Sequence, residues 1–319
     1  MNLARAPGRT ARVNCELDAY QRPTCFHARR AVVALGYAKT GAVLSALVHL
    51  SGVRGTKIGS SLEWQQQCIV GFGLSVEETT VDAASIAQAQ PIGSTVHGWA
   101  SRPRPERVTL RGNYCRVEPL DPTRHHRDLY AAYSEDTGGR IWTYMLAGPF
   151  KDATAYQRHV IESSASDDPL HFAVVEVACG RACGTLALMR ADPENGVIEV
   201  GHVAFSSRGQ RTRLSTEAQY LLMEYVFDYL GYRRYEWKCD CLNAPSRCTA
   251  HRLGFQFEGV FRQAMVYKGR NRDTAWFSII DTDWPAVQAA LKSWLSPENF
   301  DASGTQRRTL AAIRNFSVS

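Results

Sequence analysis

The chain has 319 residues, of which 45% are hydrophobic and 21% are charged. These proportions allow a packed core and exclude a wholly disordered chain, a collagen-like repeat and a protein with many membrane spans. The formal net charge is +6, shared equally between residues 1–90 and 91–319. Because no block of basic residues concentrates this charge, the composition does not indicate a nucleic-acid-binding tail. It suits an enzyme for an anionic cofactor equally well.

Residues 1–90 show no sustained helical or strand periodicity, and we interpret them as a disordered leader. Three arginines precede its first acidic residue, Glu16, a pattern also found in mitochondrial transit peptides. The longest apolar stretch, residues 31–50, is interrupted by Lys39 and does not predict a membrane span. Nine cysteines without a secretory signal predict reduced thiols. We therefore expect a cytoplasmic protein, with a mitochondrial location as the alternative.

Prolines and glycines punctuate residues 91–107, which we predict to be a linker, and regular periodicities begin after it. Apolar runs with period 2 predict strands, and apolar residues with period 3.6 predict helices. The predicted strands are residues 108–120 (around a turn at 111–113), 171–178, 182–190, 197–205, 234–240, 257–267 and 274–280. The predicted helices begin after Asp121 and Asn243 and cover residues 150–163, 216–230 and 284–295.

This order predicts a mixed α/β (α+β) fold, in which a mostly antiparallel meander leads into one βαβ crossover. The crossover comprises strand 197–205, helix 216–230 and strand 234–240. We expect one domain over residues 108–297. The polar residues 298–319 are predicted to form a flexible tail.

A polar loop, residues 206–215, connects the first strand of the crossover to its helix. The N-terminus of a helix presents unpaired N–H groups and a partial positive charge, which suit phosphate or pyrophosphate. Arg208, Arg211 and Arg213 add hydrogen-bond donors and positive charge to this loop. The loop is therefore predicted either to bind an anion or to be a solvated basic cap.

Several short motifs occur together in the second half of the chain. Their order and spacing resemble those of the GNAT (Gcn5-related) N-acetyltransferases, in particular the branch that acetylates the N-termini of ribosomal proteins. The resemblance extends over about residues 105–285. The motifs are Ile198-Glu199-Val200-Gly201-His202, residues 210–218, Asn243-Ala244-Pro245-Ser246, Leu253-Gly254-Phe255 and Glu258-Gly259.

The resemblance implies a twisted, mainly antiparallel sheet whose fourth and fifth strands splay apart to admit acetyl-CoA, with no metal. It implies transfer of the acetyl group to an amine acceptor, either a protein N-terminus or a small molecule. We expect neither a nucleic-acid nor a membrane partner, and a monomer or homodimer. The residues that the resemblance implies as contacts of acetyl-CoA are Val203, Phe205, Arg211, Arg213, Leu214, Ser215, Thr216 and Asn243.

Acetyl transfer from a thioester to an amine requires a neutral amine, a polarised carbonyl and a proton for the leaving thiolate. By resemblance, Glu199 is the candidate general base and Ser246 the candidate proton donor. Each also has a structural interpretation, Glu199 as a salt-bridge partner and Ser246 as a first-turn helix residue. His202 alternates to the opposite face from Glu199 in an ideal strand, although a bulge would change that.

Two positions depart from the family pattern. Arg213 and Ser215 stand where the phosphate loop usually has small residues, so Arg213 is predicted either to point outward or to weaken cofactor binding. Ala250 stands where many relatives have a tyrosine that acts as acid. These departures leave open a non-catalytic acyl-CoA-binding protein. The metal alternative is a zinc site formed by Cys239, Cys241, Cys248 and His251.

Overall fold

The computed structural model describes residues 33–34, 45–46 and 91–316. The chain divides into two compact units, residues 1–95 and 96–319. The predicted leader lies almost wholly outside the described residues. Within it, the strands β1 (Val33–Ala34) and β2 (Ser45–Ala46) pair in antiparallel orientation. In the described ranges, no helix is both long enough and apolar enough to cross a membrane.

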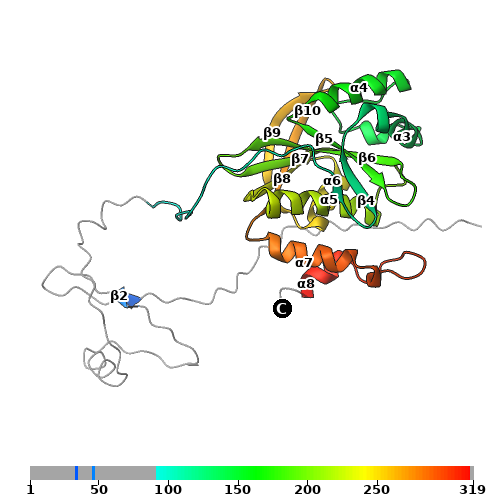
Figure 1. The fold of residues 1–319 in the computed structure, drawn as a ribbon. Coiled ribbons are helices and arrows are strands. Elements are labelled where there is room, and N and C mark those ends of the chain that lie inside the picture. Colours follow the sequence, from blue (N-terminus) through cyan, green and yellow to red (C-terminus); the bar gives the residue numbers. More distant parts are fainter. Residues whose placement is uncertain (1–32, 35–44, 47–90, 317–319) are drawn as a thin grey trace, which may run out of the picture. The chain divides into compact units, whose positions relative to one another are not determined.

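The second unit is built on one eight-stranded sheet with the order β3-β4-β5-β6-β7-β8-β10-β9 (Figure 1). Neighbouring strands are antiparallel except β7 and β8, which are parallel because a helical crossover connects them. The predicted α/β fold with its single crossover is thus confirmed. The strands are β3 (Leu110–Arg111), β4 (Cys115–Pro119), β5 (Leu170–Glu176), β6 (Ala182–Asp192), β7 (Val197–Phe205), β8 (Arg234–Asp240), β9 (Gln256–Tyr267) and β10 (Arg270–Ile280).

Helices cover both faces of this sheet, with α3 and α4 on one face and α5 to α8 on the other (Figure 1). Alternate residues of β5 serve the two cores: Phe172 and Val174 pack with α5 and α7, whereas Ala173 and Val175 pack with α3 and α4. The helices are α3 (Pro122–Ser134), α4 (Ala153–Ala165), α5 (Arg213–Glu224), α6 (Ala244–Leu253), α7 (Trp284–Leu295) and α8 (Leu310–Phe316). Short segments are η1 (Arg140–Trp142), the π-helical η2 (Tyr225–Tyr229) and η3 (Pro297–Asn299).

The crossover helix α5 begins at Arg213, whereas its apolar periodicity predicts a start at Thr216. The earlier start comes from a capping box. The Ser215 N–H donates to the Thr212 hydroxyl, and the Thr212 N–H donates to the Ser215 hydroxyl, both at 3.4 Å. This cap fixes the direction in which the first turn of α5 presents its N–H groups.

The segment predicted as a linker packs against the second unit from Val96 onward. The indole N–H of Trp99 donates to the Glu194 carbonyl at 2.9 Å. The same ring lies under the guanidinium groups of Arg102 and Arg233, at 4.5 and 5.7 Å from its centroid. The folded domain therefore begins before residue 108.

The tail predicted to be flexible instead folds back on the domain. Leu310 and Ile313 of α8 are buried in the main core. The buried Asn299 amide donates to the Trp294 and Arg308 carbonyls and accepts from the Arg308 N–H, at 3.0–3.1 Å. Only a few apolar residues anchor this tail, so its sequence shows no clear period.

The buried carboxylate of Glu217 fixes the loop between β3 and β4 to α5. It accepts hydrogen bonds from the N–H groups of Asn113, Tyr114 and Cys115 at 2.7–2.8 Å. Gly112 faces the same carboxylate, and a Cβ atom there would lie 2.3 Å from the Glu217 carboxyl carbon. A glycine is therefore required where the loop approaches the helix.

We predict that Glu217→Ala lowers the free energy of unfolding of the full chain by about 3 kcal/mol, because three backbone donors lose their acceptor. Urea denaturation measures this loss. Glu162→Gln, on the exposed face of α4, is the control and should change stability by less than about 0.5 kcal/mol. Equal stability of Glu217→Ala and the wild type would show that the loop does not depend on this carboxylate.

Candidate active site

The crossover strands β7 and β8 part along their length. Their pairing runs from Val197 opposite Arg234 to Val200 opposite Trp237, and it ends there although both strands continue. Beyond this point lies a cleft with a volume of about 2390 Å³, lined by the far halves of both strands and by the first turns of α5 and α6. The splay that the resemblance implied is therefore present.

A β-bulge shapes the β7 side of the cleft. Gly201 pairs with Ala187 and Ala204 with Thr185, so His202 and Val203 together oppose a single residue of β6. His202 has a positive φ of 51°. The bulge brings His202 to the wall of the cleft together with Glu199.

The strand edge beyond the bulge offers free backbone groups. The Ser206 N–H donates to the Cys183 carbonyl of β6 at 2.9 Å. Since successive N–H groups of a strand point to opposite sides, the Phe205 N–H points away from β6, toward the edge that β8 has left. Val203 lines the same edge. Phe205 and Val203 are thus placed where the resemblance puts acetyl-CoA contacts.

Unpaired arginines line the end of the cleft near α5. In the described part of the chain, neither Arg211 nor Arg213 forms an ion pair, whereas Arg208 in the same loop pairs with Glu135 at 2.8 Å. Arg211 has a φ of 59°. The N–H groups of Arg213 and Leu214 belong to the first helical turn, which has no intrahelical acceptors for them.

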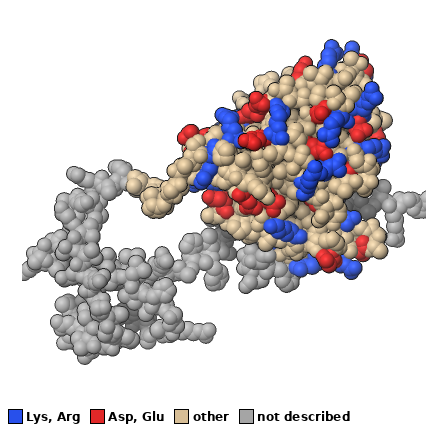
Figure 2. Space-filling model, in the orientation of Figure 1, with Lys and Arg blue, Asp and Glu red and all other residues tan. Residues whose placement is uncertain are grey.

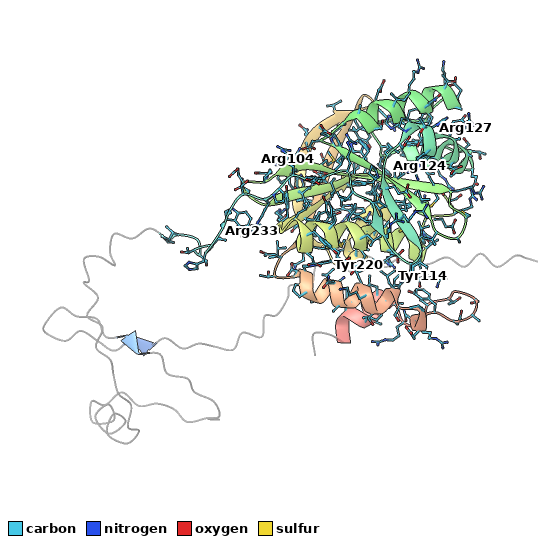
Figure 3. The ribbon with its side chains drawn as sticks, in the orientation of Figure 1. Arg104, Tyr114, Arg124, Arg127, Tyr220 and Arg233 are labelled. Carbon is cyan, nitrogen blue, oxygen red and sulfur yellow. The ribbon has the colours of Figure 1, made fainter. Side chains whose placement is uncertain are left out.

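The Arg213 side chain is directed toward the C-terminal extension, residues 297–316. Its guanidinium lies between the rings of Tyr114 and Phe300, 4.7 and 4.6 Å from their centroids. Figure 3 shows Tyr114 on the side of the domain where this extension packs. The side chain is therefore held by these two rings, and its effect on cofactor binding stays a prediction. The Leu214 side chain is buried in the core, so only its backbone can reach the cleft.

Glu199 lies at the apex of the splay, in a network of buried charges. Its Oε2 atom is 2.9 Å from Lys238 Nζ and 3.4 Å from Arg190 Nε. Lys238 also contacts Glu236, at 2.7 Å, and lies 3.7 Å from the centroid of the Trp276 ring. Burial raises the pKa of Glu199, and Lys238 opposes this rise.

The other carboxylate oxygen of Glu199, Oε1, is available to accept a hydrogen bond or a proton. Among the described residues, Oε1 accepts no hydrogen bond, and it lies on the side of Gly201, 3.8 Å from where a Cβ would be. The carboxylate can therefore be held through Oε2 while Oε1 accepts a proton.

Ser246 lies across the cleft in the first turn of α6. Its hydroxyl accepts a hydrogen bond from the Trp237 indole N–H at 3.0 Å, and its N–H donates to the Asn243 side-chain oxygen at 3.1 Å. The hydroxyl also interacts with the Cys239 thiol, whose pKa is raised by burial and lowered in part by Ser246. Because Trp237 supplies a proton to the oxygen, the Ser246 hydroxyl keeps its own proton to donate, and the Cys239 sulfur is one acceptor within its reach.

The cleft collects nearly all residues predicted from the sequence. Its walls include every proposed catalytic and cofactor residue except Leu214: Glu199, Ser246, Val203, Phe205, Arg211, Arg213, Ser215, Thr216 and Asn243. Sequence reasoning missed Lys238, Gln219 and Arg252. Lys238 follows Trp237 on β8, so strand alternation alone places its charged side chain on the opposite, solvated face. The helical periodicity gives no indication that Gln219 and Arg252 line a cleft. Ala250 is fully buried in the core.

The cysteines of the predicted zinc alternative do not assemble. Cys239 is buried, whereas Cys248 is exposed on α6. Within the described residues, no group of three or more histidine, cysteine, aspartate or glutamate side chains is arranged to hold a metal ion.

Comparison with known proteins assigns the fold to a family. The family model described as "Acetyltransferase (GNAT) domain" matches residues 116–256. A crystal structure of a GCN5-related N-acetyltransferase from Brucella melitensis shares 49% sequence identity, with a TM-score of 0.68. It covers 69% of this chain, and this chain covers 100% of it. The chain belongs to the GNAT family of acetyltransferases, and membership implies acetyl transfer from acetyl-CoA to an amine.

Two curated relatives are more distant. "Uncharacterized N-acetyltransferase p20" of Bacillus licheniformis is 27% identical over 182 residues, which are 56% of this chain and 96% of that protein. "Putative ribosomal N-acetyltransferase YdaF" of Bacillus subtilis (strain 168) is 28% identical over 106 residues, which are 33% of this chain and 57% of that protein.

The cleft fits the acetyl-CoA that the family uses. An unpaired strand edge matches an extended chain with amide groups, and the first N–H groups of α5 together with Arg211 match a pyrophosphate. The buried Gln219 side chain, whose two amide atoms have no partner among the described residues, lines the same cleft and would be satisfied by a polar ligand.

We predict that acetyl-CoA stabilises the chain by about 2.7 kcal/mol at 100 times its Kd. Arg211→Gln should weaken its binding roughly tenfold, because one charge-assisted contact is lost. Arg208→Gln removes the same charge from the same loop but leaves Glu135 unpaired, and should change the Kd less than about twofold. Thermal unfolding and calorimetric titration measure both effects. Equal weakening by the two substitutions would contradict the assigned role of Arg211.

Proposed function

We propose that this protein acetylates the α-amine of a polypeptide N-terminus, with Glu199 as general base and Ser246 as proton donor. The observation that carries the proposal is the Glu199 carboxylate at the apex of the splay, bound by Lys238 through one oxygen and with no partner for the other among the described residues. Acetyl-CoA supplies the activated thioester. The chain contributes a proton acceptor, a proton donor and the backbone groups that orient the reactants.

Glu199 has the properties that proton removal from an ammonium group requires. Glu199 lines the cleft, and among the described residues its Oε1 atom accepts no hydrogen bond, so it is available to a water or an amine. Burial raises the pKa of its carboxyl, which makes it a stronger base than an exposed glutamate. The Lys238 ammonium keeps it ionised and fixes its orientation.

Ser246 is suited to the second proton transfer. Its hydroxyl is oriented by the Trp237 indole N–H and lies on α6, directly after Asn243 caps that helix. A leaving thiolate has a pKa near that of an ordinary thiol, so its protonation requires little assistance. The contribution of Ser246 is therefore smaller than that of Glu199.

The loop between α3 and α4 forms one wall of the cleft. The Tyr144 hydroxyl donates to the Leu242 carbonyl at 3.0 Å, and Lys268 Nζ donates to the Trp142 carbonyl at 2.7 Å. These bonds tie the loop to the β8–α6 connection and to the β9–β10 turn. Ile141 and Tyr144 line the cleft from this loop. The Ile141 side chain and the Tyr144 ring give this wall a surface against which the first side chain of a polypeptide can pack.

The name of the Bacillus subtilis relative also supports a polypeptide acceptor. The runner-up acceptor is a small-molecule amine, which the same proton transfers would serve. Mass spectrometry of the products from a mixed panel of peptides and small amines separates the two. Acetylation of peptide N-termini supports the proposal, and acetylation confined to small amines would contradict it.

We predict that Glu199→Gln lowers kcat/KM by about 10²–10⁴-fold at neutral pH. The loss should shrink as the pH passes about 8, where an α-amine loses its own proton. Glu236→Gln removes the neighbouring carboxylate, which does not line the cleft, and should retain kcat/KM within a few-fold. A Glu199→Gln enzyme with full activity would exclude this residue as the base.

Lys238→Met should move the acidic limb of the pH profile of kcat/KM to higher pH. The pKa of Glu199 is already raised by burial, and losing the lysine removes a charge that lowers it. The base is active only when ionised, so activity should fall at a higher pH than in the wild type. An unchanged acidic limb would show that the ionisation of Glu199 does not set the pH below which kcat/KM falls.

Ser246→Ala should lower kcat by about tenfold or less and leave the Km for acetyl-CoA nearly unchanged, because only the departing thiolate loses a donor. Thr249→Ala, one turn further along α6, is the matched control and should retain kcat. A raised Km with an unchanged kcat would instead identify Ser246 as a binding residue. Steady-state kinetics with a verified peptide acceptor measures both constants.

A further inference from the structure

The C-terminal extension forms one wall of the cleft beside the first turn of α5. Phe300 and residues 303–306 line the cleft there, together with Trp294 of α7. The Trp294 indole N–H donates to the Gln306 side-chain oxygen at 2.8 Å and holds the loop in place. This wall lies outside residues 116–256, which match the family model.

Arg252 of α6 projects toward this wall. Its Nη1 atom donates to the Thr216 hydroxyl at 3.1 Å, and its guanidinium lies 4.7 Å from the centroid of the Trp294 ring. In the described part of the chain, no carboxylate pairs with it. Partial withdrawal from water lowers the pKa of Arg252, and a bound anion would offset that cost.

Two further polar groups lie close by. Gln219, on the next turn of α5 after Thr216, is 2% exposed, and both of its amide atoms lack a partner among the described residues. Buried amides are normally hydrogen-bonded, and Gln219 lines the cleft, so its amide can bind a polar ligand there. Arg213, held between two rings, also contributes its charge here, and its Nη2 lies 3.6 Å from where a Cβ of Gly304 would be.

We infer that Arg252, with Arg213 and Gln219, forms a second anion site that binds the 3′-phosphate of the CoA moiety. This inference rests on the proposed function, since it assumes that acetyl-CoA occupies the cleft. CoA carries two separate phosphate groups, a pyrophosphate and a ribose 3′-phosphate. The loop at Arg211 and the first N–H groups of α5 serve the first of these groups.

The second cluster of cations lies on the α6 side of α5, where Arg252 meets Thr216. It matches the remaining phosphate in charge, and guanidinium groups bind phosphate oxygens by charge-assisted hydrogen bonds. These side chains, beside the wall that the C-terminal extension forms, give the domain a means to select the 3′-phosphorylated cofactor.

Calorimetric titration of the full chain with CoA and with 3′-dephospho-CoA tests this site. The wild type should bind CoA about tenfold more tightly than 3′-dephospho-CoA. Arg252→Gln should weaken CoA binding about tenfold and leave the Kd for 3′-dephospho-CoA within about twofold. Arg247→Gln, on the same helix but outside the cleft, should leave both affinities unchanged.

Equal affinity of the wild type for the two ligands would overturn the site, and this comparison needs no substitution. Equal weakening of both ligands by Arg252→Gln would also overturn it, because the arginine would then serve the pyrophosphate or the fold. Failure of the wild type to bind either ligand is a different result, which contradicts the proposed function itself.

Discussion

The active site depends on the point where β7 and β8 stop pairing. Up to Val200 and Trp237 the two strands form a parallel ladder, and beyond it each has a free edge facing the other. A sheet normally hides such edges, because unpaired N–H and C=O groups are costly when buried. Here the free edges line a cleft, so a ligand with its own amide groups can satisfy them. The bulge in β7, the capped N-terminus of α5 and the first turn of α6 are all placed around this opening.

The apex of the splay would be unstable without Lys238. Glu199 and Glu236 are directly opposite each other in the register of the two strands, and like charges at such positions repel. Lys238 Nζ lies between them, at 2.9 and 2.7 Å, with Trp276 on its other side. Buried ion pairs of this kind contribute little net stability, because desolvation offsets the attraction. These ion pairs fix the Oε2 atom of Glu199 and leave its Oε1 atom to accept a proton.

The fold and much of the site could be predicted from the sequence, because both follow from local patterns. Alternation placed β8 at Arg234–Asp240, and Asn243 was recognised as the cap of α6. The GNAT motifs identified the cleft side chains around Glu199 and Ser246, although their roles stay predictions.

The rest depends on contacts between distant segments. Lys238 carries a charge on an alternating strand, so the pattern assigns it to solvent. Only tertiary structure reveals the two carboxylates beside it. Arg252 contacts Trp294, which in turn holds the C-terminal extension through Gln306. Arg252 is far from both in the sequence, so no local pattern predicts this contact. The packing of Trp99 on Arg233 likewise joins segments more than a hundred residues apart.

Hydrogen–deuterium exchange with and without saturating CoA tests the central claim most directly, namely that the splay is the cofactor site. Exchange should slow at the free edge of β7 around Phe205 and in the first turn of α5, where the unpaired N–H groups lie. Exchange in α4 and in the β5–β6 turn, which contribute no residue to the cleft, should not change. Protection confined to those distant segments, or no protection at saturation, would contradict the account.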